Sequence, residues 1–583
     1  MELLGNTKTK IAADKAGIIK KDSYFLTSEQ SPQIKNLLLN IANQRKAKIV
    51  ELKDLSSEYK SGLYFQTKQQ QNNLNLALNI LNTLKIKPQQ TQKVINNFRM
   101  TCRQEIMQVN PLVVLDGAHN NDKLGNLVDF INSLLVFLVN RKQYILLMIL
   151  ILFNIKEKKN GKDKIFFSRP IGKITILALD CNRYREDLEV LSFHAGVRVL
   201  FMSQKAPGWL VKQFYTKLDD LPRYINAQKG SEDAVNHKKA YEFMMEFLYR
   251  FYKYVSVNCV TTVNYRYPED YNWTKASDRL GVPFIMLYRE CLLASDNIYN
   301  YVTRRTRKFG HFHGSHIIVH NNKCKQMFID SGYASDGEVS VAGALRMDSF
   351  LRLINQDILK NKYNNKNKKF ILFYFPYNMN LFGRSATNSA ISSNRYGLYK
   401  KPWIARKKLF IDLHNAIIEL SAEYPDVDFI IKPKNVMIEN KSWNLYKYVL
   451  KRSKINVEKL PNYKVDEHLN VSDNIVSSSV ICGLQSSVVL ESAIAGKRLI
   501  FPLFYDYLSS PYSNDFFWKD YTELFDVATN KDQFKKIFRN SLNDVTVSNG
   551  VQYKRNKLFS KWFWSVSGES LSEYYTIIKN IAR

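Results

Sequence analysis

The sequence is poor in cysteine and proline, with six cysteines and 15 prolines among 583 residues. The cysteines are scattered, and no two of them form a C-x-x-C pair. This spacing signals neither a zinc site nor a disulfide framework and fits a reducing compartment. Residues 1–10 also lack the basic flank and apolar run of a secretory signal peptide. We therefore expect a cytoplasmic protein.

Long apolar runs are missing as well. Residues 130–140 and 144–155 are both strongly apolar, but Arg141, Lys142 and Gln143 separate them. Each run is shorter than the roughly 20 apolar residues that a membrane-spanning helix needs. We expect a helix followed by a buried strand in this region, and the alternative is a membrane hairpin.

Acidic residues are the minority among the charges. The chain has 85 Lys and Arg against 53 Asp and Glu, a formal net charge of +32. Such a charge favours phosphates, nucleic acid or the inner face of an anionic membrane, to which the protein would attach peripherally. The lysines of residues 360–369 alternate with asparagines, however, which is typical of compositional bias. Since no nucleic-acid-binding motif accompanies them, we expect no specific nucleic-acid partner.

The length of 583 residues exceeds what one hydrophobic core supports, because cores stop growing at about 250–300 residues. Hydrophobic residues make up 45% of the chain and aromatic residues 13%, as in a folded protein. We expect three globular units and one linker. Their ranges are 1–165, 168–355 and 371–583, with the linker at 356–370.

The first unit contains two motifs, residues 4–20 and Leu115-Asp-Gly-Ala-His-Asn120. The second motif follows the short apolar strand predicted at residues 111–115, where α/β proteins place ligand contacts. The alternative is that His119 is an ordinary turn residue. Helical spacing at residues 34–41 and 74–84 predicts two amphipathic helices. The chain has no G-x-x-x-x-G-K-[ST] sequence, so it lacks the usual phosphate cradle for ATP.

Both motifs, in this order, resemble the folylpolyglutamate and dihydrofolate synthase family, which is related to the Mur ligases. The resemblance implies that Lys15 is a carbamylated lysine that helps to hold metal, that Arg103 is the arginine preceding a glutamate, and that Asp116 and His119 contact nucleotide. The family's metal-binding histidine before the first motif is not found. We expect a truncated, vestigial ligase segment with a Mur-ligase C-terminal-like α/β fold. ATP and Mg²⁺ would be needed only if this segment were active.

From residue 171 onward, short apolar strands alternate with amphipathic helices, a pattern that favours parallel sheets in doubly wound domains. The first set of predicted strands covers residues 174–179, 198–202, 284–287 and 316–319, with a helix at 240–255. The second set covers residues 370–375, 429–432, 474–477 and 498–501, with helices at 412–423 and 488–495. The fold class is α/β, and two such Rossmann-like domains with a ligand cleft between them are typical of the GT-B architecture.

Three motifs in this part support a second resemblance: residues 341–348, 430–434 and 485–502. They resemble the surface-carbohydrate glycosyltransferases, the glycerophosphotransferases of teichoic acid synthesis and the nucleotide-sugar epimerases. The sequence departs from these families where the usual K-P-H-P reads Lys432-Pro-Lys-Asn435. The resemblance implies a nucleotide-sugar donor bound by residues 370–530 and an acceptor bound by the first domain.

The predicted donor site has two parts. Ser486 and Ser487 are cap-type residues before an apolar helix, whose free N–H groups would attract a diphosphate. Glu491 corresponds to the glutamate that accepts hydrogen bonds from the ribose hydroxyls in many GT-B enzymes. The alternative for these three residues is ordinary capping with a solvated glutamate.

Further basic residues are expected at the donor. Lys432 follows a buried strand and would neutralise the leaving diphosphate, or else is a solvated strand-end lysine. Arg346 follows Gly343 in the hinge-like motif and is a second candidate phosphate contact, with a structural salt bridge as its alternative.

The catalytic base should be a carboxylate or a histidine on the first domain. Glu290 has the favoured position after the strand at 284–287, and Asp180 is another candidate. His313 and His316 could imitate a metal cluster, although a turn and a strand start explain them better. We expect no bound metal in the transferase.

Together these features imply an enzyme that transfers a sugar or a related unit from a nucleotide donor to a glycan or a lipid-linked acceptor. Three alternatives stay open: a nucleotide-sugar 2-epimerase, a residual folate-type ligase, and an inactive nucleotide-sugar-binding protein.

Overall fold

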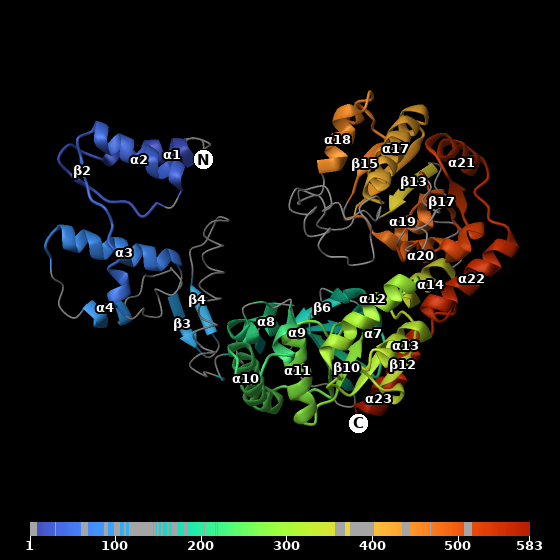
Figure 1. Ribbon diagram of the computed structural model, residues 1–583, viewed down its shortest axis with the longest axis horizontal. Helices are drawn as coiled ribbons and strands as arrows, with labels where there is room; N and C mark the ends of the chain where they lie inside the picture. The colour runs from blue at the N-terminus through green and yellow to red at the C-terminus, as the bar shows by residue number, and fades with distance from the viewer. Residues whose placement is uncertain are drawn as a thin grey trace. The chain divides into compact units, whose positions relative to one another are not determined.

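The structure is a computed structural model, and the chain divides into two compact units, residues 1–154 and 155–583. Figure 1 shows their helices and strands. The structure describes residues 8–29, 31–59, 68–86, 91–97, 105–109, 112–115, 144, 147, 151–152, 155–159, 162–165, 173–179, 183–202, 205–215, 217, 220–355, 368–373, 402–433, 444–466, 468–484, 486–505 and 516–582.

The first unit consists of short helices and two small strand pairs. Its helices are α1 (Lys8–Lys15), α2 (Pro32–Gln44), α3 (Lys68–Thr83) and α4 (Thr91–Asn97). Strands β1 (Tyr24–Phe25) and β2 (Lys48–Ile49) pair in parallel, and β3 (Glu105–Val109) and β4 (Leu112–Leu115) pair antiparallel. The two predicted helices and the strand at 111–115 are confirmed by α2, α3 and β4.

The second apolar run differs from its prediction. Residues 144, 147, 151 and 152 are helical, so the strand expected at 144–155 is wrong for these positions. Residues 130–140 lie outside the described part. Among the helices that the structure describes, none combines the length and the apolar character that crossing a bilayer requires.

The second unit contains an eight-stranded sheet with the order β12-β11-β10-β9-β7-β8-β5-β6. Strands β7 to β12 run parallel, and β5 and β6 extend the edge antiparallel. All four strands predicted in this region are confirmed. The sheet begins before residue 168, where we placed the start of the domain. The strands are β5 (Lys156–Lys159), β6 (Lys162–Ile165), β7 (Ile174–Ala178), β8 (Val197–Phe201), β9 (Cys259–Thr262), β10 (Phe284–Leu287), β11 (His316–Val319) and β12 (Val339–Val341).

Helices connect these parallel strands. The predicted helix at 240–255 is confirmed within α10, which begins where the Ser231 hydroxyl accepts the Ala234 N–H. Its buried face carries Phe243, Phe247 and Phe251, whose rings stack in succession. The helices are α7 (Arg185–Leu191), α8 (Lys205–Val211), α9 (Leu221–Ile225), α10 (Glu232–Tyr254), α11 (Pro268–Arg279), α12 (Asp296–Thr306) and α13 (Asn322–Asp330).

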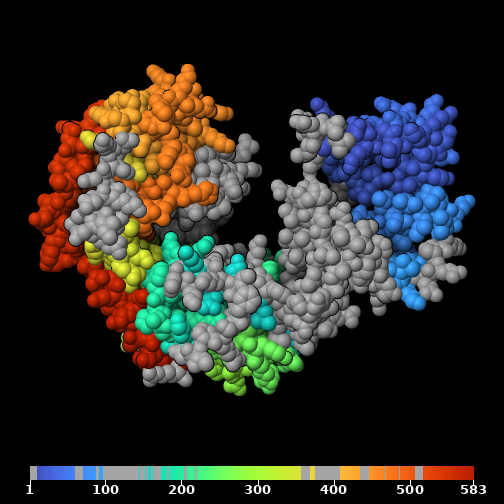
Figure 2. Space-filling view, turned by 180° about the vertical axis from the view of Figure 1, so that it is seen from behind, coloured from blue at the N-terminus to red at the C-terminus, as the bar shows by residue number. Residues whose placement is uncertain are grey.

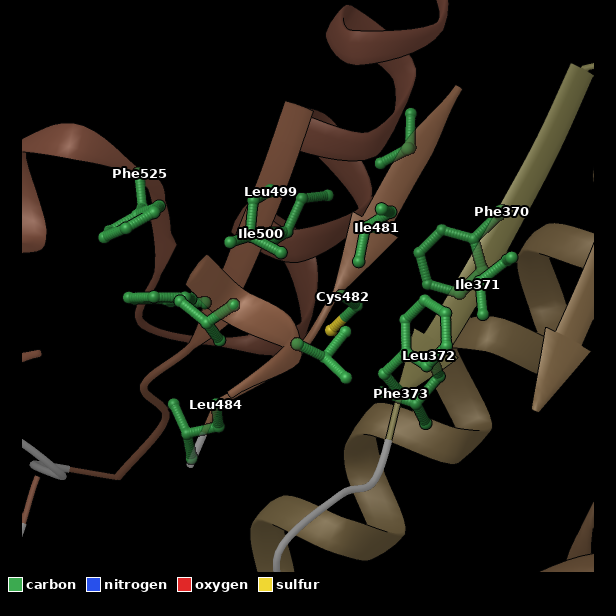
Figure 3. Packing of buried hydrophobic residues seen from close by; sticks show 14 of the residues in the cluster. Phe370, Ile371, Leu372, Phe373, Ile481, Cys482, Leu484, Leu499, Ile500 and Phe525 are labelled. Atoms are coloured by element: carbon green, nitrogen blue, oxygen red, sulfur yellow. The ribbon is translucent and has the colours of Figure 1, made fainter. Parts of the chain in front are cut away.

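The six strands of the other sheet are all parallel, in the order β15-β14-β13-β16-β17-β18. Figure 3 shows its core, in which Phe370 to Phe373 face Ile481, Cys482, Leu499 and Ile500. The two parallel sheets are consistent with the expected pair of Rossmann-like domains. The strands are β13 (Lys368–Phe373), β14 (Val427–Lys432), β15 (Tyr463–Val465), β16 (Val480–Cys482), β17 (Arg498–Pro502) and β18 (Asp526–Ala528), with helices α17 (Pro402–Glu423), α18 (Asn444–Arg452), α20 (Val488–Ile494) and α21 (Lys531–Asn543).

One predicted strand of this sheet is wrong. Residues 474–477 form the end of helix α19 (Val471–Ser477), and the strand is β16, three residues later. The Asn470 side chain accepts the Asp473 N–H and thereby starts the helix. Within α19 only Ile475 is buried, whereas all of β16 is buried.

The C-terminal residues return to the first sheet. Helix α22 (Asn549–Phe563) packs in the core of the second sheet, whereas α23 (Ser570–Ile581) places Tyr574 and Ile578 in the core of the first. The range that we assigned to the second domain, 371–583, thus includes a helix of the first core. Figure 2 shows the red C-terminal residues beside both the orange residues of the second sheet's part and the teal and green residues of the first sheet's part.

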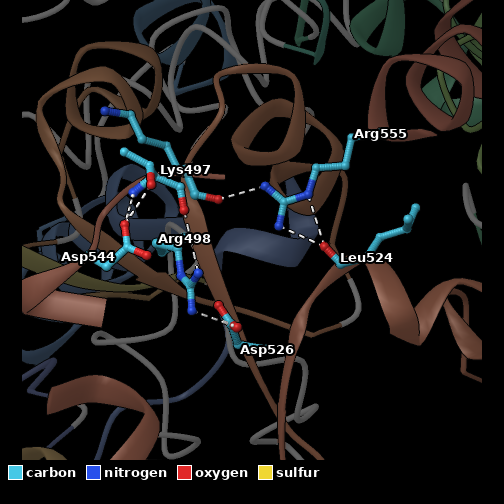
Figure 4. A network of polar contacts seen from close by, with 7 residues as sticks. Lys497, Arg498, Leu524, Asp526, Asp544 and Arg555 are labelled. Atoms are coloured by element: carbon cyan, nitrogen blue, oxygen red, sulfur yellow. Dashed lines mark hydrogen bonds and ion pairs between the residues drawn. The ribbon is translucent and has the colours of Figure 1, made fainter. Parts of the chain in front are cut away.

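Helix α22 is held to the second sheet by a buried arginine (Figure 4). The Arg555 guanidinium donates to the Leu524 carbonyl from Nε at 2.9 Å and from Nη2 at 2.7 Å, and to the Lys497 carbonyl from Nη1 at 2.8 Å. Alongside it, Arg498 forms an ion pair with Asp526 at 2.9 Å.

The chain crosses between the sheets a first time at residues 342–347. Ala342 and Leu345 belong to the first core, and Met347, in α14 (Met347–Asn355), to the second. The buried Asp348 carboxylate accepts the Ser570 N–H at 3.2 Å and the Leu571 N–H at 2.7 Å. This carboxylate therefore joins the first crossing to the second, at the start of α23.

Gly343 lies where the two crossings touch. Its φ of +77° is in the left-handed region, and a Cβ there would stand 2.6 Å from Ser570 Oγ and 2.8 Å from the Phe563 carbonyl. The Tyr574 hydroxyl donates to the Gly343 carbonyl at 3.1 Å. Only glycine fits this position without displacing the returning chain.

Replacement of the Asp348 carboxylate should loosen the second crossing. Asp348→Ala leaves two N–H groups at the start of α23 without their charged acceptor, so we expect a loss of about 2–4 kcal/mol in the free energy of unfolding. Urea denaturation followed by tryptophan fluorescence measures this loss. Asp336→Ala, which removes an exposed ion pair with Lys325, should cost no more than about 1 kcal/mol. Equal effects of the two substitutions would contradict the assigned role.

Candidate functional site

The strand order of the first sheet determines where ligand contacts are expected. β7 has β8 on one side and β9 on the other, so the connections after β7 and β9 lead in opposite directions. Ligands of open α/β sheets bind at the carboxyl ends of strands at such a switch point. Ligand contacts are therefore expected from the residues that follow β7, β9 and β10.

The buried Asp187 carboxylate organises this edge. One of its oxygens forms an ion pair with Arg289 Nε at 2.9 Å, and the other accepts the Arg346 N–H at 2.9 Å. The Arg289 guanidinium also approaches Glu186 at 3.3 Å and donates to the Arg183 carbonyl. Asp187 thus holds the end of β10 and the first crossing together.

Glu491 brings the second sheet into the same set of charges. It lies in α20, is buried, and accepts a hydrogen bond from the Ser487 hydroxyl at 3.2 Å. Burial raises the pKa of Glu491, the positive charge of Arg346 lowers it, and Glu186 raises it further. We call Glu186, Asp187, Arg289, Arg346 and Glu491 the central charged cluster.

The serines before α20 are both engaged. Ser486 Oγ accepts the Val488 N–H at 3.3 Å, which agrees with the capping alternative, while Ser487 donates to Glu491. The same alternative assumed a solvated glutamate, and this is wrong because Glu491 is only 6% exposed. Helix α20 has seven residues. Diphosphate binding at its start stays a prediction.

The two basic donor candidates occupy different environments. Lys432, at the end of β14, is buried and donates from Nζ to the Pro433 carbonyl at 3.1 Å, so it is not a solvated lysine. Arg346 is half-buried, with its guanidinium 5.6 Å from the centre of the Phe563 ring. Phosphate contacts by Lys432, Arg346 and Gly343 stay predictions.

Glu290 is exposed at the end of β10, as predicted, and its charge acts on Arg266. Arg266 is fixed by the Asn264 side-chain oxygen, which accepts its N–H at 2.8 Å and its Nε–H at 3.3 Å. The role of Glu290 as a base stays a prediction. Asp180 lies outside the described residues.

The histidine alternative gains no support. His316 begins β11 and its Nε2 lies 2.8 Å from Ser340 Oγ, whereas the His313 ring contacts Tyr271 edge-on at 5.4 Å. Burial lowers the pKa of both histidines. Across the described ranges, no three His, Cys, Asp or Glu side chains gather in a way that could hold a metal ion.

Of the ligase-like residues, Lys15 is the exposed last residue of α1. Arg103, Asp116 and His119 lie outside the described residues, so their implied roles stay predictions.

Sequence reasoning missed Arg183, Glu186, Asp187 and Arg289. The first three belong to the charged string Arg183-Tyr-Arg-Glu-Asp187, which follows the first predicted strand, and Arg289 directly precedes Glu290. Charged residues at the ends of predicted parallel strands were the signal that could have identified them.

Comparisons with known proteins give distant similarities only. No family model and no curated protein match the chain. The UDP-GlcNAc 2-epimerase from Neisseria meningitidis bound to UDP-GlcNAc is similar at a TM-score of 0.38 and 15% identity, over 70% of this chain and 100% of that one. UDP-GlcNAc 2-epimerase from Methanocaldococcus jannaschii is similar at a TM-score of 0.38 and 13% identity, over 70% of this chain and 99% of that one. Trehalose 6-phosphate synthase from Burkholderia multivorans is similar at a TM-score of 0.38 and 8% identity, over 70% of this chain and 97% of that one.

The buried Glu491 carboxyl should make stability depend on pH. Folding raises the pKa of Glu491, so ionising this group costs no stability below its pKa in the unfolded chain, about 4.3. The cost grows as the pH rises from there through the pKa of the folded protein. Glu491→Gln removes this penalty. The stability of the variant relative to the wild type should therefore increase with pH, by about 1.4 kcal/mol for each unit by which folding raises the pKa. Thermal unfolding from acidic to mildly alkaline pH measures it, and exposed Glu573→Gln is the control. A difference that is constant with pH would contradict the prediction.

Proposed function

We propose that residues 168–583 form a nucleotide-sugar-dependent enzyme of the glycosyltransferase type that acts in surface polysaccharide synthesis. It would transfer a sugar or a related unit from an activated nucleotide to a glycan or a lipid-linked acceptor. The observation that carries the proposal is the central charged cluster, in which the positive charges of Arg346 and Arg289 act on the buried carboxyl group of Glu491.

Glu491 has the properties of a hydroxyl acceptor. A carboxylate offers about four lone-pair positions. Within the part of the chain that the structure describes, the Ser487 hydroxyl donates to this carboxyl group at 3.2 Å, and no other side chain does so. A buried carboxylate with so few donors is costly to the protein unless a ligand supplies more. The two hydroxyls of a ribose match this requirement, which supports a nucleotide at this position.

The charge on a leaving diphosphate also finds partners nearby. Arg346 lies within electrostatic reach of Glu491 and can form the paired hydrogen bonds that phosphate oxygens favour. Lys432 adds a second cation if its ammonium turns from the Pro433 carbonyl. Fixed cations stabilise the charge that develops as the bond to the diphosphate breaks. The proposal therefore requires no bound metal for this step.

Glu290 is assigned as the base in the acceptor reaction. The acceptor oxygen forms a bond to the anomeric carbon, and the electron pair of the sugar–phosphate bond leaves with the nucleoside diphosphate. The acceptor hydroxyl proton passes to the exposed Glu290 carboxylate. The formal net charge of +32 favours approach to an anionic membrane and its lipid-linked acceptors.

A nucleotide-sugar 2-epimerase is the second candidate. The edge of the first sheet carries more than one carboxylate, Glu186 and Glu290 among them, and an epimerase uses acids and bases on a single substrate. It would act on the nucleotide sugar without an acceptor. An inactive binding protein would keep the donor contacts without turnover, and a residual ligase would need ATP and Mg²⁺.

Calorimetry with the full chain tests the donor site. We expect one class among the UDP-, CDP- and GDP-sugars to bind, and Glu491→Ala to weaken that binding about 10- to 100-fold through the lost charged hydrogen bonds. Exposed Glu573→Ala is the matched control and should bind as the wild type does. Absence of nucleotide-sugar binding, or binding of ATP alone, would sink the proposal.

Product analysis distinguishes the two candidate reactions. A transferase should release nucleoside diphosphate only when an acceptor is present, and Glu290→Gln should lower kcat by about 100-fold or more with little change in KM. Chromatography and mass spectrometry of the products measure both effects. Formation of an isomeric nucleotide sugar without acceptor would favour the epimerase. Unchanged kcat in Glu290→Gln would remove this residue from the reaction.

A further inference from the structure

Exposed positive charges gather on helix α18 and the residues that follow it, beside the edge strand β15 of the second sheet (Figure 1). Residues 444–464 contain six Lys and Arg and one acidic residue, Glu458, so their net charge is 6 − 1 = +5. All six cations are exposed: Lys447, Lys451, Arg452, Lys454, Lys459 and Lys464. We call the four that lie on α18 or directly after it, Lys447, Lys451, Arg452 and Lys454, the α18 basic surface.

The packing of α18 fixes the direction of this surface. Tyr446 and Val449 are buried in the core of the second sheet, and the Tyr446 hydroxyl lies 2.7 Å from the Tyr463 hydroxyl of β15. Lys447 and Lys451 are four residues apart, so they lie on one face of the helix. Because the apolar side of α18 is held by the core, its cations are presented to the surroundings.

The cations of the α18 basic surface lack acidic partners. Within the described residues none of the four forms an ion pair, whereas on α10 the exposed Lys238 pairs with Glu242 at 3.7 Å. The acids Glu419 and Glu423 of α17, the helix that packs against α18, pair with cations of α21 instead. The positive charge of α18 is therefore not neutralised by the described part of the protein.

Ordinary helix stabilisation does not account for this charge. Cations in the last turn, such as Lys451 and Arg452, interact favourably with the helix dipole. Lys447, however, lies near the start of the helix, where the dipole disfavours a cation, and like charges four residues apart, such as Lys447 and Lys451, destabilise a helix. This unfavourable arrangement is explained if an anionic partner compensates it.

The side chains favour a lipid surface over nucleic acid. Single-stranded nucleic acid stacks its bases on open aromatic rings. In this segment Tyr446 and Tyr463 are buried, and the Arg452 guanidinium covers the Tyr448 ring at 4.5 Å from its centre. A helix that carries at least four cations suits anionic phospholipid headgroups, and tyrosine is favoured at headgroup level.

We propose that the α18 basic surface binds an anionic lipid bilayer. Each cation near such a surface strengthens binding by about fivefold, and the attraction falls off within about 10 Å in 0.1 M salt. The inference deepens the proposed function, on which the lipid-linked acceptor rests, by identifying which part of the protein meets the membrane.

Sedimentation of the full chain with lipid vesicles tests the proposal. We expect binding to vesicles of phosphatidylcholine mixed with phosphatidylglycerol, and little binding to phosphatidylcholine alone. The double variant Lys451→Gln and Arg452→Gln should weaken this binding by about 25-fold, since two cations are lost. Lys238→Gln with Arg250→Gln is the matched control, because it removes the same charge from exposed cations that glutamates already pair. The control should bind vesicles as the wild type does.

Several outcomes would overturn the inference. These are absence of vesicle binding, equal losses in the two double variants, and binding of DNA or RNA oligonucleotides in place of vesicles. If the first double variant does not fold, Lys447→Gln with Lys454→Gln takes its place, and unchanged vesicle binding would then overturn the inference. Vesicle binding without binding of any UDP-, CDP- or GDP-sugar would overturn the proposed function and leave the lipid surface in place, so the two failures are distinguishable.

Discussion

The hydrogen bonds of the buried Asp348 carboxylate are the contact on which the arrangement of the second unit depends. The chain crosses from one sheet to the other at residues 342–347 and returns before α23, and Asp348 binds the backbone of the returning segment. Gly343 allows the close approach, because any side chain there would meet the returning chain. Two adjacent crossings constrain the sheets more than one flexible linker would. This constraint keeps residues of the first sheet near α20 of the second.

The central charged cluster is possible because most of its charges are paired. Asp187 forms an ion pair with Arg289 and accepts the Arg346 backbone N–H, so burial of this carboxylate is compensated. Glu491 is less well satisfied, and burial raises its pKa. Incomplete pairing of buried carboxylates costs stability, and a protein retains such groups where a ligand completes their hydrogen bonds. In the proposed function, Glu491 is the carboxylate that a nucleotide would complete.

Much of the fold could be predicted from short apolar runs, because strands of a parallel sheet are buried on both faces. The strands at 174–179, 284–287 and 429–432 are confirmed for this reason. Residues 474–477 were misassigned because Ile475 and Val476 suggested a strand, whereas the Asn470 cap starts a helix there. The return of α23 to the first core depends on tertiary contacts that no local pattern encodes.

The candidate site was predictable only where a motif indicated it. Glu491 and Arg346 belong to such motifs, and the structure brings them within electrostatic reach of each other. Arg289 and Asp187 belong to no motif. Their importance arises from burial and pairing, which depend on how the strand ends are arranged in space. Charge at the end of a predicted strand was a usable signal for Arg289, whereas the hydrogen bond from the Arg346 backbone to Asp187 could be found only in the structure.

Backbone hydrogen exchange with UDP, CDP and GDP, each added in turn to the full chain, tests the central claim most directly. If the two sheets share one nucleotide site, one of these diphosphates should slow exchange together at residues 183–187, 343–348 and 486–491. Slower exchange at only one of these segments, or at none of them, would contradict a site built by both sheets.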